Sequence, residues 1–312
     1  MIGSVLGVIL NCLLMYIIFK TTTQQNKEYT KMLKAASFFD MLFSFTELIT
    51  QHTLVVKRGW MIMIPNGFEK WAGANWYVPF YMLHMFVMAM GMYIFLAQYH
   101  YRYSLLSQPV TSEWLLFRNI VIAMTVSILA AVFSVWVLNP SLVNGSWHYL
   151  KFLDKMWSPD GNKTYAYAID TDYPRALAYF YLLGVLSTVF FWSCVFYVYK
   201  IMKYVYQPME NISSKTRRMQ IQFTVVIIIQ GLTCFLFSYL PISFIAVFTL
   251  LRTQNEYVGL FMLMPLSWLP ATNGLVSLLL VKAHRSTLFN MLLCRKRDAK
   301  NAIGQSTVQS LG

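Results

Sequence analysis

Long apolar stretches alternate with short polar ones along most of the chain. Seven of the apolar stretches are long enough to cross a bilayer, because about 20 apolar residues in a helix span a hydrocarbon core of roughly 30 Å. They cover residues 1–19, 33–56, 77–99, 115–138, 176–199, 219–249 and 258–281. The pattern predicts an all-α membrane protein: a seven-transmembrane helix bundle over 1–281, followed by a basic tail over 282–312.

Two of the predicted spans have features of their own. The stretch 219–249 is longer than a bilayer requires, so we expect its ends to project or tilt and Pro241 to kink it. The first stretch has no basic residue before its apolar run, and Lys20 and Lys27 follow it. It therefore resembles a first span more than a signal peptide, and no external N-terminal domain is expected.

The composition agrees with a membrane location. Apolar residues make up 57% of the chain and charged residues 12%, with a mean hydropathy of +0.51. These values lie outside the usual range of soluble globular domains. We therefore expect membrane lipids as partners, and no nucleic acid.

Basic residues are unequally distributed between the two sides of the predicted bundle. The segments 20–34, 100–118 and 200–218 and the tail together hold 17 Lys and Arg residues, whereas the opposite loops hold 8. Basic loops remain on the cytoplasmic side of a membrane. The N-terminus is therefore expected outside, and the C-terminus in the cytoplasm.

Two glycosylation sequons lie in the loop predicted to be external. They begin at Asn144 and Asn162, whereas a third sequon, at Asn211, lies in a loop predicted to be cytoplasmic. We expect glycans at the first two positions only. Glycans at Asn144 and Asn162, without one at Asn211, would independently support the predicted topology.

The four cysteines offer no pair for an external disulfide. Cys12, Cys194 and Cys234 lie inside predicted spans, and Cys294 lies in the tail. Cys294 precedes the basic run 295–297, a setting in which palmitoylation and charge together hold a tail on anionic lipid. A plain reduced cysteine is the alternative.

Four short motifs follow one another along the chain. They are Gly7-Val8-Ile9-Leu10-Asn11 with Lys20 after it, Ile64-Pro65-Asn66-Gly67, Tyr101-Arg102-Tyr103, and Lys282-Ala283-His284-Arg285. In this order and spacing the chain resembles the nematode seven-span serpentine chemoreceptors, class delta first and otherwise another class of that superfamily. One departure is Pro270-Ala271-Thr272-Asn273-Gly274, where family members often carry an acid followed by proline.

The resemblance implies a function as well as a fold. It implies a rhodopsin-like, G-protein-coupled chemosensory receptor in the plasma membrane of sensory neurons. Its partners would be a small odorant or pheromone-like molecule and a heterotrimeric G protein. No cofactor is expected.

Arg102, with tyrosines on both sides, lies at the predicted exit of the third span. One interpretation is an anchored helix end, in which Arg102 extends to the interface and Tyr101 and Tyr103 lie among the headgroups. The other is a switch, because Arg102 resembles the arginine that holds the inactive state of rhodopsin-like receptors. The residue before it is Tyr101 and not an acid, so the local ion pair of that motif is absent.

Asp40 and Glu47 are the acidic residues within the predicted spans. Seven residues at 100° each complete almost two turns, so both carboxylates lie on one helix face, about 10 Å apart. Intramembrane acids are costly and mark candidate functional sites. Asp40 either resembles a sodium-linked acid or belongs to a structural polar cluster with Asn11 and Asn273, in which the two acids share a proton.

Polar-tipped aromatic residues among methionines predict a ligand pocket in the outer half of the bundle. Such a pocket suits a small, mainly apolar molecule with one or two hydrogen-bonding groups. The candidates are Tyr81, His84, Tyr179, Tyr239, Ser243 and Trp268. For each residue singly, helix packing is the alternative role.

Other function classes find less support in the sequence. The five histidines are too widely spaced for a metal pair on one helix, and no Gly-x-Ser-x-Gly elbow occurs, so we expect neither an enzyme nor a metal site. The main alternative is a ligand-gated channel or a seven-span transporter. No internal repeat of the kind found in transporters is present.

The hypothesis from the sequence is thus a two-state receptor. A small external molecule binds among the outer halves of the helices, and a cytoplasmic crevice opens for a G protein. Arg217 and Arg218 in the third inner loop would steer this acidic partner, although lipid headgroups would attract the same charges.

Overall fold

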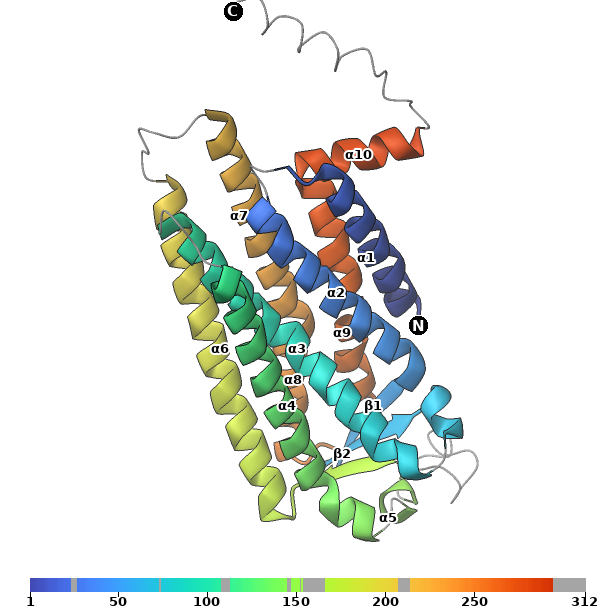
Figure 1. The fold of residues 1–312 in the computed structure, drawn as a ribbon. Coiled ribbons are helices and arrows are strands. Elements are labelled where there is room, and N and C mark those ends of the chain that lie inside the picture. Colours follow the sequence, from blue (N-terminus) through green and yellow to red (C-terminus); the bar gives the residue numbers. More distant parts are fainter. Residues whose placement is uncertain are drawn as a thin grey trace, which may run out of the picture.

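The chain folds into a bundle of long helices with a small sheet at one end (Figure 1). The structure, a computed structural model, describes residues 1–23, 27–72, 74–107, 113–144, 147–151, 153, 166–206 and 214–293. The long helices are α1 (Ile2–Thr21), α2 (Lys27–Thr50), α3 (Ala74–Ser107), α4 (Glu113–Asn144), α6 (Pro174–Tyr206), α7 (Ser214–Cys234) continuing into α8 (Leu240–Leu250), and α9 (Tyr257–Leu280). Short helices are η1 (Phe68–Trp71), α5 (Trp147–Leu150) and α10 (Lys282–Leu292).

Within the described residues, six helical segments are long and apolar enough to cross a membrane. They are α1, α3, α4, α6, the continuous α7–α8 segment and α9. The remaining long helix, α2, carries the two buried acids Asp40 and Glu47. It packs against α1, α3 and α9, so neighbouring helices cover its polar face and α2 completes the bundle.

The predicted span 33–56 is wrong at its C-terminal end. Helix α2 stops at Thr50, and residues 52–57 form the first strand of a three-stranded antiparallel sheet. The strands are β1 (His52–Lys57), β2 (Trp60–Pro65) and β3 (Tyr167–Asp170).

A two-residue turn joins β1 to β2. Arg58 and Gly59 both have positive φ (55° and 86°), which a tight hairpin of this twist requires. The hairpin pairs Lys57 with Trp60, and its strands contain two Val and two Ile residues, which favour extended backbone. The first strand was therefore hidden at the end of the predicted span 33–56, whereas the turn and the second strand lie in what the sequence predicted as a loop.

Strand β3 belongs to the long loop between α4 and α6, and it pairs with β2 from Trp60 to Met63. In the described part of the chain, Cys12, Cys194 and Cys234 are free thiols, as the sequence predicted. Backbone pairing, rather than a disulfide, therefore attaches this loop to the end of the bundle.

The sixth span is interrupted just before Pro241. Residues Phe235–Tyr239 form a π-helical turn, and α8 begins at Leu240. Proline lacks the N–H of a regular helix, and its ring clashes with the carbonyl four residues earlier. A π turn before the proline accommodates both effects, so the predicted kink site is a change of helical register.

Helix α10 runs across the end of the bundle opposite the sheet (Figure 1). It exposes Phe289 and Leu292 together with the basic residues Lys282 and Arg285, and Leu293 directly after the helix is exposed as well. Such a helix suits a membrane interface. The segment predicted as a tail thus begins with a helix.

Candidate functional site

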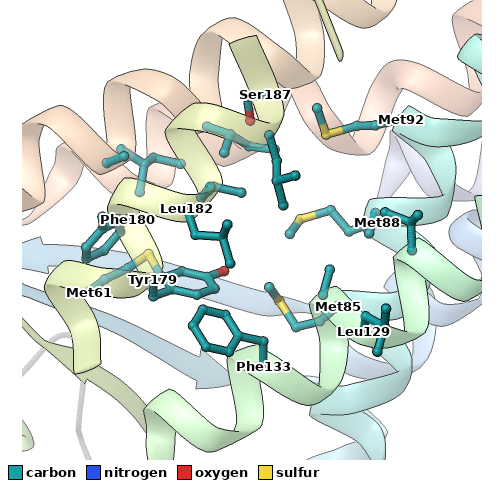
Figure 2. Close-up of a pocket in the computed structure, with 18 of the residues that line it drawn as sticks. Met61, Met85, Met88, Met92, Leu129, Phe133, Tyr179, Phe180, Leu182 and Ser187 are labelled. Carbon is teal, nitrogen blue, oxygen red and sulfur yellow. The ribbon is translucent and has the colours of Figure 1, made fainter. Parts of the chain in front are cut away.

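A large apolar cavity of about 740 Å³ lies in the half of the bundle next to the sheet. Helices α3, α4 and α6 form most of its wall, with contributions from α8, α9 and the β1–β2 hairpin. Five methionines line it, Met61, Met63, Met85, Met88 and Met92. Figure 2 shows Met61, Met85, Met88 and Met92 among leucine and aromatic side chains. Unbranched thioether side chains adapt to ligands of different shape.

Few polar atoms reach this cavity. Tyr179 turns its hydroxyl toward the open space, and Ser187 contributes another hydroxyl from the same helix, α6 (Figure 2). Tyr93 of α3 is the third hydroxyl-bearing residue of the lining. The described lining residues include no Asp, Glu, Lys, Arg or His. The cavity therefore suits an uncharged, largely apolar molecule with one or two hydrogen-bonding groups.

The residues predicted to bind a ligand are not brought together. Tyr179 lines the large cavity, whereas Tyr239 lines a second cavity of about 350 Å³ between α3, α6 and α7. Ser243 donates a hydrogen bond to the backbone oxygen of Tyr239 (2.8 Å), and Trp268 packs beside Gly3 of α1. Of these residues only Tyr179 touches the large cavity.

Tyr81 and His84 are fully buried beside the sheet and do not line the large cavity. The Tyr81 ring lies 4.7 Å from that of Tyr167, and the His84 ring lies 4.5 Å from that of His52. Both residues thus face the sheet. The periodicity of one helix does not reveal which neighbour its side chains meet.

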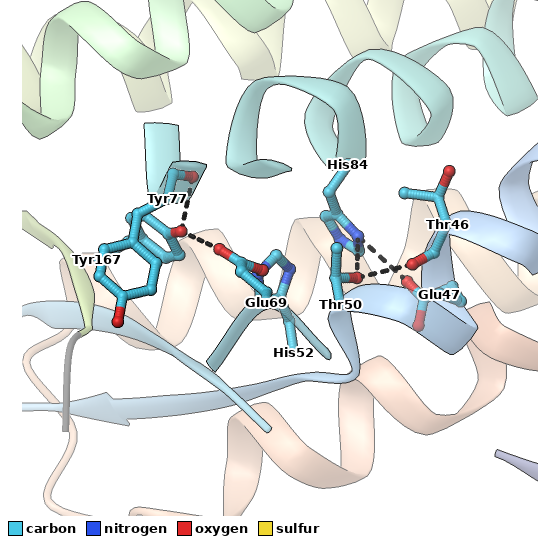
Figure 3. A network of polar contacts seen from close by, with 8 residues as sticks. All are labelled: Thr46, Glu47, Thr50, His52, Glu69, Tyr77, His84 and Tyr167. Carbon is cyan, nitrogen blue, oxygen red and sulfur yellow. Dashed lines mark hydrogen bonds and ion pairs between the residues drawn. The ribbon is translucent and has the colours of Figure 1, made fainter. Parts of the chain in front are cut away.

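A buried polar network connects α2 and α3 to the sheet (Figure 3). His84 Nδ1 lies 3.4 Å from Glu47 Oε1 and 3.3 Å from the Thr50 hydroxyl. On the other side of the paired imidazole rings, His52 Nε2 lies 2.8 Å from Glu69 Oε2. The network therefore joins two carboxylates through two histidines.

Tyr167 completes this network. Its hydroxyl donates to the backbone oxygen of Tyr77 (2.7 Å) and also touches Glu69. A phenol has one proton to donate, so the Glu69 oxygen beside it is well placed to donate when Glu69 is protonated. Burial raises the pKa of Glu69 to about 7 and lowers the pKa of His52 to about 3, which favours the neutral forms of both groups.

The two intramembrane acids have different partners. Asn273 Nδ2 lies 3.3 Å from each carboxylate oxygen of Asp40, whereas Glu47 pairs with His84. The expectation that Asp40 and Glu47 share a proton is therefore wrong: one carboxylate faces α9 and the other faces α3.

Asn11 belongs to the same polar region as Asp40 without a hydrogen bond to it. Its amide donates to the backbone oxygens of Gly7 and Pro270 (2.9 Å each), and its oxygen accepts from Ser37 (2.9 Å). Gln230 of α7 donates to Asn273 O (3.2 Å). Helices α1, α2, α7 and α9 are thus joined through polar side chains.

Arg102 is buried and bonded across the bundle. Its Nη2 donates to the backbone oxygen of Gln220 (3.0 Å) and to the side-chain oxygen of the same residue, and Thr224 Oγ1 lies 3.5 Å away. With only 3% of its surface exposed, Arg102 does not extend to the interface, so the anchored-end interpretation is wrong.

The neighbouring tyrosines attach the same end of α3 to other helices. Tyr99 donates to Ile227 O of α7 (3.0 Å), and Tyr101 donates to Glu28 Oε2 of α2 (2.9 Å). Tyr103 packs edge-on against Tyr204 of α6. Arg217 and Arg218 begin α7 on this side and are exposed.

Sequence comparison matches residues 1–290 to the family described as "Serpentine type 7TM GPCR chemoreceptor Srd". The match covers nearly the whole chain. The chain belongs to this family. It is therefore a multi-pass membrane protein of the serpentine chemoreceptor class, as the motifs of the sequence predicted.

The solved structures that the receptor resembles include squid rhodopsin. The match has a TM-score of 0.60 at 14% identity and covers 98% of this chain and 87% of that chain. At this identity the likeness shows the fold alone, and the predicted rhodopsin-like seven-helix bundle is confirmed. No curated protein sequence matches the receptor.

Three residues of the receptor are predicted modification sites. Asn144 is the last residue of α4, whereas Asn162 and Cys294 lie outside the described residues. Glycosylation and palmitoylation therefore stay predictions. Within the described part, no group of His, Cys, Asp and Glu is arranged to hold a metal ion.

The sequence pattern missed most of the receptor's cavity. Its methionine and aromatic side chains come from segments far apart in the chain, such as Met61 of β2 and Leu263 of α9. It also missed the pairing of Glu69, which resembled a loop residue, with His52, which the predicted span 33–56 had included. A signal for the sheet was present in the sequence, because Arg58-Gly59 separates a short apolar run, Leu54-Val55-Val56, from a longer one that begins at Trp60.

Proposed function

We propose that the chain is a G-protein-coupled chemosensory receptor in the plasma membrane of sensory neurons. It binds a small odorant or pheromone-like molecule in the large apolar cavity and signals to a heterotrimeric G protein. One observation carries the proposal: α3 contributes Met85, Met88 and Met92 to the cavity at one end and Arg102 to a bonded contact with α7 at the other.

The contacts of α3 support a two-state mechanism. Arg102 and Tyr99 both donate to backbone oxygens of α7, at Gln220 and Ile227. While these bonds persist, the ends of α3 and α7 stay together and the crevice between them is closed. A ligand that shifts α3 favours the state in which the bonds are broken.

Aromatic residues between the two ends support transmission through α6 and α7. Phe191 of α6 stacks on Tyr239 (5.6 Å) and lies 5.1 Å from Phe235, both in the π-helical turn. Ser187, one helical turn before Phe191, lines the large cavity. Displacement of α6 by a ligand would therefore reach the irregular segment of α7–α8.

Charge supports the orientation and the coupling surface. The end of the bundle that carries Arg102 and α10 also carries the exposed Arg217 and Arg218. We place this end in the cytoplasm, since basic residues favour that side and would attract an acidic G-protein surface. The N-terminus is then outside.

A signalling screen tests the proposal. Full-length protein is produced in cells with a panel of Gα subunits, and uncharged compounds of medium chain length are screened for G-protein activation. The variant Met88→Trp fills the cavity, and Val121→Trp places the same ring on the exposed outer side of α4. We expect an agonist response that Met88→Trp lowers at least tenfold and Val121→Trp preserves.

Two results would overturn the proposal. One is an agonist response that Met88→Trp leaves intact at equal surface expression, which would place the ligand elsewhere. The other is a ligand-evoked current that persists in cells without G protein, which would support the ligand-gated channel.

A further inference from the structure

The large cavity is closed toward the sheet. Leu54, Met61 and Met63 of the hairpin line it and are 3%, 8% and 5% exposed. The hairpin itself is held in place, since Arg58 N donates to Thr253 O (2.8 Å) and Lys57 pairs with Glu256. A ligand that enters from the water at the sheet end would therefore require the β1–β2 hairpin to move.

The same cavity is open on the side between α4 and α6. Leu129 and Val132 of α4 and Leu182 of α6 all line it, yet they are 62%, 49% and 40% exposed. A residue that lines a cavity and is also exposed lies at its rim. These three residues, called the lateral rim below, belong to helices that cross the membrane.

Contacts between α4 and α6 are found at the sheet end of this opening. The Arg175 guanidinium lies over the Trp136 ring (5.1 Å), and the Phe133 and Tyr179 rings are 5.9 Å apart. Leu129 lies about 10 Å farther along α4 than Trp136. The α4–α6 contacts therefore close the opening near the membrane–water interface at the sheet end. Farther from the sheet, the opening faces the hydrocarbon region of the membrane.

We propose that the ligand of this cavity is an uncharged amphiphile with an aliphatic chain, and that it arrives from the bilayer through the lateral rim. This proposal rests on the proposed function and names the route and ligand class of that same site. Methionines and leucines receive the chain, and the hydroxyls of Tyr179 and Ser187 receive its single polar group.

Partitioning gives the route its physical basis. Each methylene removed from water favours the bilayer, so a molecule with a chain of about eight carbons is concentrated there. The exposed rim residues are apolar and offer such a molecule no polar barrier. A charged molecule would find no partner among the described lining residues.

Photolabelling tests the route on full-length protein in phosphatidylcholine nanodiscs. The probe is a long-chain alcohol with a diazirine in its chain, and labelled Met85, Met88 and Met92 are quantified by mass spectrometry at increasing times after mixing. Val132→Trp obstructs the rim. Val121→Trp is the matched control, because Val121 is an exposed valine of α4 that does not line the cavity.

We expect Val132→Trp to slow labelling of the three methionines at least fivefold, with Val121→Trp equal to the unchanged protein. Leu182→Trp obstructs the rim from α6 and replaces Val132→Trp if the latter does not fold. Equal rates in the rim variants and the control would overturn the lateral route. The proposed function is tested separately, by the signalling response of Met88→Trp.

A second probe distinguishes a free molecule from a bilayer lipid. It is a phosphatidylcholine with the same diazirine in one acyl chain. We expect it to label the rim but not the three methionines. Labelling of those methionines by the lipid as strongly as by the alcohol would overturn the free amphiphile as occupant, and no labelling by either probe would overturn the site.

Discussion

Arg102 and Gln220 join α3 to α7 at the end of the bundle opposite the sheet. The guanidinium donates both to the backbone oxygen of Gln220 (3.0 Å) and to its side-chain oxygen. Arg102 is buried, and its neighbour Tyr101 is bonded to α2 rather than to Arg102. The contact that fixes this end is therefore made between helices, without an acid next to the arginine.

Two substitutions of Gln220, by alanine and by glutamate, should change basal signalling in opposite directions. Gln220→Ala removes one hydrogen bond to a charged group, worth about 1.5–3 kcal/mol, so basal activity should rise about tenfold. Gln220→Glu adds a charge partner for Arg102 and should lower it. Ligand-free G-protein activation at equal surface expression measures both, and changes of the same sign would contradict the interpretation.

Gly231 should not tolerate a side chain. A Cβ at this position would lie 1.7 Å from the Tyr99 hydroxyl oxygen. We expect Gly231→Ala to lower stability by about 1–3 kcal/mol, as overpacking does, and Tyr99→Phe to restore part of it in the double variant. Thermal unfolding in nanodiscs measures this. Gly184→Ala is the control, because a Cβ there meets no atom within 4 Å.

The contribution of Glu69 to the stability of the sheet end should fall as the pH rises toward neutrality. Burial raises the pKa of Glu69 to about 7, above its ordinary value of 4.5. Between these values the folded protein holds a proton that the unfolded chain releases, so the contribution of Glu69 falls as pH rises from about 4.5 to 7. In Glu69→Gln this fall should be absent.

His52 acts in the opposite direction, because burial lowers its pKa from 6.5 to about 3. Its contribution rises with pH over that range, and both proteins keep this residue. The difference in melting temperature between the unchanged protein and Glu69→Gln, measured at pH 5 and pH 8, reports on Glu69 together with its contact to His52. A difference that does not vary with pH would contradict the assignment.

Tyr179 should distinguish ligands by their polar group. Tyr179→Phe keeps the ring against Phe133 but removes the hydroxyl that points into the cavity. We expect about tenfold weaker responses to agonists with a hydrogen-bonding group, the equivalent of one hydrogen bond, and unchanged responses to purely apolar ones. Tyr239→Phe lies outside the large cavity and keeps the ring that stacks on Phe191, so it should leave both dose–response curves unchanged.

Arg217 and Arg218 should affect coupling and not ligand binding. Replacing both by alanine removes exposed positive charge at the start of α7 and should weaken G-protein activation severalfold, most clearly at low ionic strength. Lys70→Ala removes an exposed charge at the sheet end and serves as control. Unchanged activation by correctly delivered double variant would exclude a coupling role.

The sequence determined the class of the molecule. Long apolar stretches require helices in lipid, since an unpaired backbone polar group is too costly there, and this requirement is local to each stretch. The same local rule failed at 52–57, where one apolar run contains both the end of α2 and a strand. Hydropathy measures how apolar a segment is and not its backbone conformation.

Only the tertiary structure decided which side chains meet. Helical periodicity placed Asp40 and Glu47 on one face of α2, but the packing of α9 and α3 gave one carboxylate Asn273 and the other His84. Because of the same packing, Tyr81 and His84 lie outside the large cavity, whereas Met61 lines it. Side-chain partners depend on how helices and sheet are arranged in space, and contacts between residues far apart in the chain fix that arrangement.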